Sequence, residues 1–334
     1  MYLPDIVGKG YGEFWRFKGR YRVVKGSRAS KKSYTTALWY IYNMMKISDT
    51  NLLVVRKVSD TNRSSTHKQL ITAIKRLKVD HLWEYSEKPS GALDITYKPT
   101  GQRILFKGLD NPTKVTSTTV SSGYLCWVWF EEAYEVLNED DFDKVDMSIR
   151  GTMPGHVFKQ ITLTFNPWND KHWMNKRFFW DDDKPIKADI GVLESEGKFI
   201  HKNTDDTFVM TTNHKLNEFL DTEDKRLFNE MKKRSNKKYM VAGLGMWGIA
   251  EGLIFENWQE RLFDWTLLRK NSNIEMKIGL DFGYTNDPTA IVPYLINQKD
   301  KTIYIFDEIY EKGLSNESIY NKHTQKEWSR EKVF

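Results

Sequence analysis

A basic loop between an apolar strand and a helix is the first candidate for chemistry in this sequence. Phosphate-cradling loops read G-x-x-x-x-G-K-S/T at such a place, and residues 26–33 read GSRASKKS. Lys32 and Ser33 stand where a lysine reaches the β- and γ-phosphates and a hydroxyl reaches magnesium, whereas Lys31 replaces the second glycine. A basic surface loop is the alternative interpretation. The candidate ATP-binding residues are Gly26, Ser27, Arg28, Ala29, Ser30, Lys31, Lys32 and Ser33.

Two consecutive acids make the second candidate. The apolar strand expected at 124–130 runs directly into Glu131 and Glu132, about a hundred residues after the loop. A phosphate-loop ATPase needs an acid at a strand end to hold magnesium, and a second acid to orient or deprotonate the attacking water. Glu131 and Glu132 could fill these two roles. The alternative is a buried strand that enters an ordinary acidic loop.

A third polar group follows the strand expected at 158–165. Thr164, Asn166 and Pro167 would lie at the carboxyl edge of a parallel sheet, where open α/β folds bind their ligands. A strand-capping turn is the simpler alternative, because Asn-Pro is common in turns.

The fourth candidate is Asp281 in the sequence GLDFGYTNDPTA (279–290), which we expect inside an apolar strand. A lone carboxylate in such a strand is costly unless it is paired or binds a metal, and two-metal nucleases hold their ions with several carboxylates. Glu308, on the third strand of the expected meander, is the best local partner, while Asp287 is expected to cap a turn. Alternation along the strand turns Asp307 to the opposite face from Glu308. The alternative is a hairpin with an exposed aspartate.

Strands that alternate with helices are expected to position these groups. The pattern favours a P-loop NTPase-type parallel α/β sheet with helices on both faces, followed by the start of a ribonuclease-H-like unit. We expect an ATPase domain at 1–248, a connector at 249–272 and part of a nuclease domain at 273–334. Helices are expected at 32–46, at 61–78 and from about Ser315, a hairpin at 94–107, and strands at 21–25, 51–57, 124–130, 158–165, 277–283, 290–297 and 302–310.

Charge and composition limit the class of protein. The chain has 334 residues and a net charge of +6, but residues 1–80 hold 17 Lys and Arg against 5 Asp and Glu. A basic face of this kind can bind nucleic-acid phosphates, or it can simply be solvated. Cys126 is the single cysteine, which excludes an internal disulfide framework and a cysteine-rich zinc site and favours a reducing, cytosolic setting. No apolar run is long enough to span a bilayer, so no membrane partner is expected.

The order of these motifs resembles the large subunit of tailed-phage terminases, over essentially the whole chain. In that family the loop often reads GGRGSGKS, and Arg28 and Ser30 of this sequence fit that variant. The stretches 106–117 (FKGLDNPTKVTS), 211–221 (TTNHKLNEFLD) and 243–248 (GLGMWG) also resemble family motifs in the expected order. Two family glycines of the loop are replaced by Ala29 and Lys31.

The resemblance implies an ATP-driven translocase for double-stranded DNA with an attached endonuclease that is incomplete here. It implies a nucleotide site with Mg²⁺ at Ser33 and Glu131, water polarised by Glu132, and an extra loop cation at Arg28. It further implies motion coupled through Thr164 and Asn166, and nuclease Mg²⁺ or Mn²⁺ at Asp281, with Glu308 as the local candidate. The implied partners are a terminase small subunit, the portal protein of the prohead and further copies in a ring, in the cytoplasm of an infected bacterial host. A helicase or recombination ATPase, and a non-enzymatic DNA-binding protein with a relic loop, are the alternatives.

Overall fold

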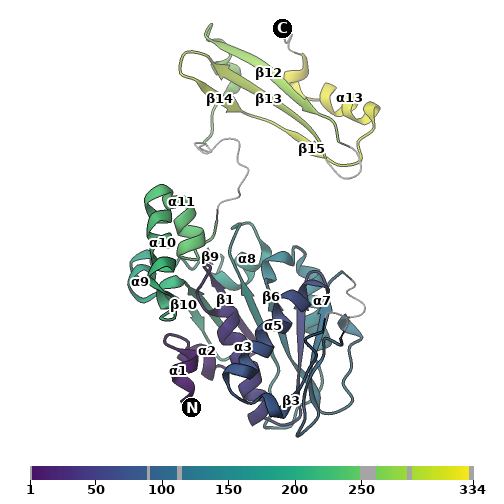
Figure 1. The fold of residues 1–334 in the computed structure, drawn as a ribbon. Helices are drawn as coiled ribbons and strands as arrows, with labels where there is room; N and C mark the ends of the chain where they lie inside the picture. The colour runs from purple at the N-terminus through teal and green to yellow at the C-terminus, as the bar shows by residue number, and fades with distance from the viewer. Residues whose placement is uncertain (1, 89–90, 111–114, 249–260, 284–287, 331–334) are drawn as a thin grey trace. The chain divides into compact units, whose positions relative to one another are not determined.

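The computed structural model describes residues 2–88, 91–110, 115–248, 261–283 and 288–330. The chain separates into two compact units, Met1–Leu253 and Ile254–Phe334, called here the N-terminal and C-terminal units (Figure 1). The domain boundaries expected at 248 and 272 stay a prediction, because residues 249–260 lie outside the described residues.

A nine-stranded sheet forms the centre of the N-terminal unit, in the order β10-β11-β1-β7-β6-β2-β5-β4-β3. The run from β11 to β5 is parallel, while β10, β4 and β3 pair antiparallel at the two edges. The strands are β1 (Tyr21–Gly26), β2 (Thr50–Arg56), β3 (Trp83–Glu84), β4 (Ile95–Tyr97), β5 (Gln102–Gly108), β6 (Tyr124–Glu131), β7 (Gln160–Phe165), β10 (Lys198–Asn203) and β11 (Thr207–Thr212).

Helices cover both faces of this sheet (Figure 1), because successive strand residues point to opposite faces. Val24 faces the core that holds α3 (Lys32–Lys46) and α5 (Thr66–Arg76), whereas Val23 faces the core that holds α7 (Glu139–Ser148) and α8 (Trp173–Phe179). The expected parallel α/β sheet with helices on both faces is therefore confirmed. The other α-helices that the structure describes in this unit are α1 (Leu3–Val7), α2 (Gly12–Arg16), α4 (Thr61–Ser64), α9 (Ile190–Glu196), α10 (Thr222–Arg234) and α11 (Asn236–Lys238).

The helix expected at 61–78 is in fact two helices, α4 and α5, which break at Ser65. Ser65 has φ −120° and ψ −88°, outside the helical region. The hydroxyl groups of Ser64 and Ser65 both donate to the Thr61 carbonyl oxygen, and Thr66 donates to that of Asn62. Serine and threonine side chains compete in this way with the helical hydrogen bonds, which explains the break.

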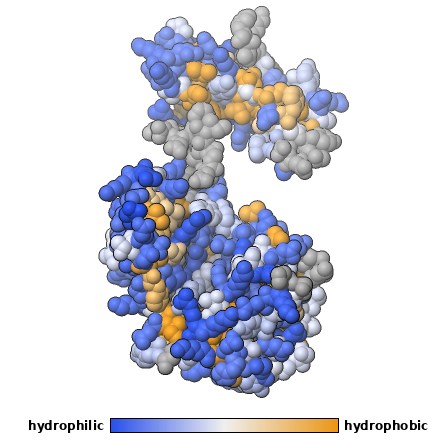
Figure 2. Space-filling model, viewed as in Figure 1, coloured by the Kyte–Doolittle hydropathy of each residue, from blue (hydrophilic) through white to orange (hydrophobic). Residues whose placement is uncertain are grey.

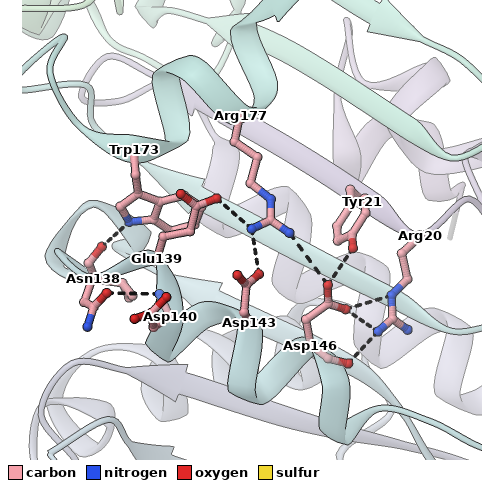
Figure 3. Close-up of polar contacts among 10 residues, drawn as sticks. Arg20, Tyr21, Asn138, Glu139, Asp140, Asp143, Asp146, Trp173 and Arg177 are labelled. Atoms are coloured by element: carbon pink, nitrogen blue, oxygen red, sulfur yellow. Dashed lines mark hydrogen bonds and ion pairs between the residues drawn. The ribbon is translucent and has the colours of Figure 1, made fainter.

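Two arginines hold α7 against its neighbours, Arg20 directly before β1 and Arg177 on α8 (Figure 3). Arg177 on α8 pairs with Glu139 at 2.8 Å and with Asp143 at 2.6 Å, and Arg20 pairs with Asp146. The Tyr21 hydroxyl also donates to Asp146, at 2.5 Å. Because α7 follows the acid pair at the end of β6, these contacts fix the far end of the segment that carries those acids.

The C-terminal unit contains a four-stranded antiparallel sheet, in which both β14 and β15 pair with β13. The single strand expected at 302–310 is therefore two short strands. Figure 2 shows apolar surface on the visible side of this unit, whose exposed apolar residues include Ile303 and Ile305. Its elements are α12 (Trp265–Leu268), β12 (Ile274–Asp281), β13 (Thr289–Asn297), β14 (Thr302–Ile305), β15 (Ile309–Glu311) and α13 (Asn316–Thr324). In the described parts of both units, no helix combines the length and apolar character needed to cross a bilayer.

Candidate nucleotide-binding site

The first three candidate groups of the sequence meet at one edge of the sheet. Strands β11, β1, β7 and β6 are neighbours and parallel, so their carboxyl ends lie side by side. Gly26 pairs with Thr212, and Glu131 pairs with Thr164. The phosphate loop (26–33), the acid pair and the end of β7 therefore form one site.

The loop adopts its path without the two family glycines. Ala29 has φ 59° and Lys31 has φ 64°, both in the left-handed region that glycine adopts most easily. Each such residue costs about 1–2 kcal/mol relative to a right-handed conformation. Lys31 occupies the N-cap position of α3, so the helix begins at Lys32 as expected. Neither replacement removes the turn that directs the loop into the helix.

The Lys31 side chain points to a separate cluster that explains this residue. Its ammonium forms an ion pair with Glu218 and donates to the Lys9 carbonyl oxygen at 3.3 Å. The rings of Phe219 and Tyr11 lie 5.3 and 5.9 Å from the ammonium. Burial lowers the pKa of Lys31, and the Glu218 carboxylate opposes that shift. Lys31 thus joins the loop to the N-terminal residues and to the segment after β11.

The segment that follows β11, which includes η3 (His214–Leu216), supports the backbone of the phosphate loop. The Asn217 side chain donates to the Ala29 carbonyl oxygen at 2.8 Å, and the His214 backbone N–H donates to Ser27 Oγ at 3.1 Å. His214 also stacks on Phe228 of α10, with ring centroids 3.9 Å apart. The family-like stretch 211–221 therefore holds the loop in place, a role that the sequence alone did not assign to it.

Lys32 lies under the loop, close to both acids. Its Nζ donates to the Ser27 carbonyl oxygen at 3.4 Å. Burial lowers the pKa of Lys32, and the nearby carboxylates of Glu132 and Glu131 oppose that shift. A cation held in this way can bind phosphate oxygens without first leaving another strong partner.

Glu131 is buried, with 4% of its surface exposed, and is tied to both neighbouring elements. The Thr164 hydroxyl donates to its carboxylate, and this hydroxyl accepts a hydrogen bond from Trp129 Nε1 at 2.8 Å. Burial raises the pKa of Glu131 and the neighbouring Glu132 adds to the rise, while a hydrogen bond from Ser33 opposes it. The predicted magnesium residues Ser33 and Glu131 thus lie near each other, and Thr164 orients the acid.

Glu132 occupies a strained turn that sequence reasoning did not foresee. Its φ of 51° and ψ of 47° place it in the left-handed region, immediately before η2 (Ala133–Glu135). The turn is closed by a 2.9 Å hydrogen bond from the Glu135 N–H to the Glu132 carbonyl oxygen. Arg56, at the end of β2, then pairs with both carboxylate oxygens of Glu135 at 3.1 Å. Arg56 is a residue that no sequence motif indicated.

The remaining predicted residues of the site differ in their exposure to solvent. Arg28 is exposed on the loop, while Asn166 is buried directly after β7. Ser30 donates no side-chain hydrogen bond in the described structure, and its buried Oγ has no partner there. An unpaired buried hydroxyl is costly, so this oxygen fits a loop that is completed by a ligand.

Gly245, in the stretch 243–248 that resembles a family motif, packs closely against the phosphate loop. A side chain at this position would meet Gly26 Cα at 2.9 Å and Ser27 N at 2.8 Å, and its φ of 76° also favours glycine. Its carbonyl oxygen accepts a 2.7 Å hydrogen bond from Lys25, which is fully buried between Phe179 and Trp247. Burial lowers the pKa of Lys25 to about 7.

The fourth candidate differs from its expected setting. Asp281 is the last residue of β12 and is exposed, as are Leu280 and Phe282, so the expectation of a carboxylate inside a buried strand is wrong. The physical reason is that β12 pairs only with β13 among the described residues, which leaves its end uncovered. Glu308 is also not on a strand, because it lies between β14 and β15 and is exposed.

Asp281 and Glu308 do not lie on neighbouring strands. Strand β13 separates them, since Ala290 pairs with Asp281 on one side and with Tyr310 on the other. Two strand spacings amount to about 10 Å between the backbones. Among the described residues, no group of three His, Cys, Asp or Glu side chains is placed to hold a metal. Asp287 lies outside the described residues.

Comparison with known proteins identifies the family. A sequence model described as phage terminase large subunit matches residues 18–246, which is more than half of the chain. This chain belongs to the phage terminase large subunit family. The match covers the phosphate loop, the acid pair and the segment 211–221 together, and it decides against the helicase or recombination ATPase that the loop and acids alone left open.

Two curated relatives agree with this assignment. The terminase large subunit of Bacillus phage SPP1 is 32% identical over 298 residues, covering 88% of this chain and 64% of that protein. The PBSX phage terminase large subunit of Bacillus subtilis strain 168 is 26% identical over 307 residues, covering 89% and 66%. This terminase chain thus spans just under two thirds of the length of these relatives. A solved large terminase from a thermophilic bacteriophage is 15% identical with a TM-score of 0.49, covering 93% of this chain and 68% of that one.

Proposed function

We propose that this chain is the ATP-hydrolysing motor subunit that drives double-stranded DNA into a phage prohead. The observation that carries the proposal is the hydrogen bond from Thr164 on β7 to the buried carboxylate of Glu131, beside the buried Lys32 of the phosphate loop. This arrangement joins the phosphate loop, the acid strand and the next strand in one site. It has no evident purpose in a protein that only binds DNA.

The residues of the site fit ATP and magnesium. Lys32 would bind the β- and γ-phosphates, Ser33 and Glu131 would hold the ion, and the N–H groups at the start of α3 would face the phosphates. Magnesium, when bound, neutralises charge that develops on the transferred phosphoryl group. Arg28, exposed on the loop, would supply a further cation. Ser33 lies near Glu131, so both side chains are available to one ion.

Glu132 would hold the attacking water and accept its proton. Its backbone leaves the strand in a left-handed conformation, and its carboxylate stays close enough to Lys32 to interact with it. Thr164 and Asn166, at the end of β7, would couple hydrolysis to movement, since Thr164 donates a hydrogen bond to Glu131, the proposed magnesium ligand.

The partners and setting of the whole protein belong to the same proposal. The motor would act as a ring of copies on the portal, receive DNA from a terminase small subunit, and work in the cytoplasm of the infected bacterium. Asp281 would be the first Mg²⁺ or Mn²⁺ ligand of a ribonuclease-H-like endonuclease in the C-terminal unit. Family membership and the basic first 80 residues support this picture.

Steady-state ATP turnover of wild type and Glu132→Gln, with and without duplex DNA, tests the proposal. We expect Glu132→Gln to bind nucleotide but to lose hydrolysis by about 10²–10⁴-fold, because it can no longer accept a proton. Asp140→Asn, at an exposed acid on the first turn of α7, is the matched control and should keep full turnover. Equal turnover in Glu132→Gln and wild type would contradict the assignment.

A further inference from the structure

A basic groove opens beside helices α4 and α5, and no residue of the phosphate loop lines it. Its volume is about 240 Å³, and its lining includes Arg63, His67, Lys68 and Lys75, with Glu87 on the opposite wall. Nothing in the nucleotide chemistry described above uses these side chains.

The three cations of the groove differ in their contacts, because Arg63 is fixed by hydrogen bonds, Lys68 is exposed and Lys75 forms an ion pair. Two nitrogens of Arg63 donate to the carbonyl oxygens of Lys88 and Gly91 at 3.1 and 2.7 Å, which fixes the guanidinium and leaves further N–H donors. Lys68 is exposed and has no ion-pair partner in the described part of the chain. Lys75 pairs with Glu87 at 2.6 Å, and both side chains are at least half exposed.

His67 adds a buried group without a partner. The residue is 2% exposed, and its ring packs against Phe106 with the centroids 5.5 Å apart. Its Nε2 makes no hydrogen bond within the described structure. A buried polar atom without a partner is costly, so a ligand that satisfies His67 would recover part of that cost.

We propose that this groove binds backbone phosphates of duplex DNA. The inference rests on the proposed function and names the surface that meets the DNA. Lys68 and Lys75 are seven residues apart on α5, hence on one face and about 10 Å apart along the axis. DNA carries a phosphate every ~3.4 Å of rise on each strand, so a row of cations this long matches a polyanion better than a single small anion.

The groove also connects to the acid pair. Ser65, at the break between α4 and α5, accepts a 3.0 Å hydrogen bond from Arg56 Nη1. The other terminal nitrogen of Arg56 pairs with Glu135, which closes the turn at Glu132. The hydrogen bond from Arg56 to Ser65 and its ion pair with Glu135 therefore link the helix break beside the groove to the turn that carries the residue proposed to activate water.

The test is the salt dependence of duplex binding by the 334-residue chain. Fluorescence anisotropy of a labelled duplex is followed without nucleotide, over a series of potassium chloride concentrations. Each lost phosphate contact should make the slope of log K against log salt shallower by about 0.9, for Lys68→Ala and for Arg63→Ala. Glu87→Gln frees Lys75 and should tighten binding, a gain that damage to the fold would not produce. Lys176→Ala, at an exposed lysine of α8, is the matched control.

Two results would overturn the assignment of the groove to DNA. The first is equal slopes for Lys68→Ala and Lys176→Ala with no tightening in Glu87→Gln, while wild type still binds duplex. The second is calorimetric binding of inorganic phosphate that Lys68→Ala abolishes, with the DNA slope unchanged, which would assign the groove to a small free anion. If wild type binds no duplex at all, the DNA part of the proposed function fails with it, and ATP turnover measured without DNA tests the rest separately.

Discussion

Lys31 and Glu218 form an ion pair in which only 2% of the lysine side chain is exposed, although 187 residues separate the two in sequence. The pair turns the Lys31 ammonium toward Tyr11 and Phe219. Lys32, the next residue, instead lies under the loop beside the acid pair. Two adjacent lysines of the same charge therefore have different roles.

The first prediction separates these lysines. Lys32→Ala should weaken nucleotide binding more than Lys31→Ala, because only Lys32 is placed to reach phosphates. A titration with a fluorescent ATP analogue measures both affinities. Lys31→Gly is the matched control, since glycine adopts the left-handed backbone of this position without strain. A larger loss in Lys31→Ala than in Lys32→Ala would mean that the loop uses a different register.

The second prediction concerns Thr164. Thr164→Val removes the hydroxyl that holds Glu131 and leaves Trp129 Nε1 without its acceptor. We expect a clear drop in kcat with a smaller change in nucleotide affinity, and a loss of stability of about 1–3 kcal/mol. Thr162→Val is the control, because Thr162 is equally buried on the same strand but accepts from Arg22 instead. It should cost stability without a comparable loss of turnover; equal kcat losses would remove the special role of Thr164.

The third prediction assigns a positioning role to Arg56. Arg56→Met breaks the contacts to Ser65 and Glu135 and should loosen the turn at Glu132. Turnover should fall while the KM for ATP changes little, because the phosphate loop is untouched. Glu135→Gln should have a similar effect, and the double variant should be little worse than either single variant. Additive losses in this cycle, measured by steady-state kinetics, would show that the two residues act independently.

The fourth prediction is a pH dependence of stability that comes from Lys25. Burial lowers the pKa of Lys25 to about 7 in the folded chain, whereas an unfolded lysine titrates near ~10.4. Between these values the unfolded state binds the extra proton, so this group makes stability rise with pH, by up to about 1.4 kcal/mol per pH unit. Chemical denaturation of wild type and Lys25→Met at pH 7 and pH ~8.5 measures it, because the contributions of Cys126 and the tyrosines are the same in both proteins and cancel in the comparison. The rise should be smaller in Lys25→Met; an equal rise would assign it to other groups.

Local rules predicted one part of the site well. The helix at 32–46 was confirmed residue for residue, because an apolar face and a preceding polar loop specify it within a short window. The strands that end in Gly26 and Glu131 were equally clear from their apolar runs. Since parallel strands align their carboxyl ends, the meeting of the loop with the acids followed from the fold class.

The residues that brace the site could not be predicted in this way. Asn217 and Glu218 reach the loop from almost two hundred residues away, and Arg56 meets Glu135 across 79 residues. Contacts of this range leave no periodic signal in the sequence. The error at Asp281 has a different cause, because the apolar letters around it were read as burial, whereas the end of β12 is left uncovered among the described residues.

The last prediction concerns DNA cleavage. Two-metal hydrolysis of a phosphodiester needs several carboxylates around the ions. Among the described residues, Asp281 does not belong to a cluster of carboxylates that could hold a metal. Glu308 lies two strands away. Asp307 already accepts hydrogen bonds from Lys326 at 3.0 Å and Trp328 at 2.7 Å. We therefore expect the 334-residue chain to show no robust nuclease activity on plasmid DNA, even with Mn²⁺. A longer form of the protein should cut DNA and lose cutting on Asp281→Ala, with Asp300→Ala, at an exposed acid of the same unit, as the control. Efficient cleavage by the 334-residue chain that Asp281→Ala abolishes would show that its own carboxylates complete the site, and that the separation of Asp281 from Glu308 closes when metal binds.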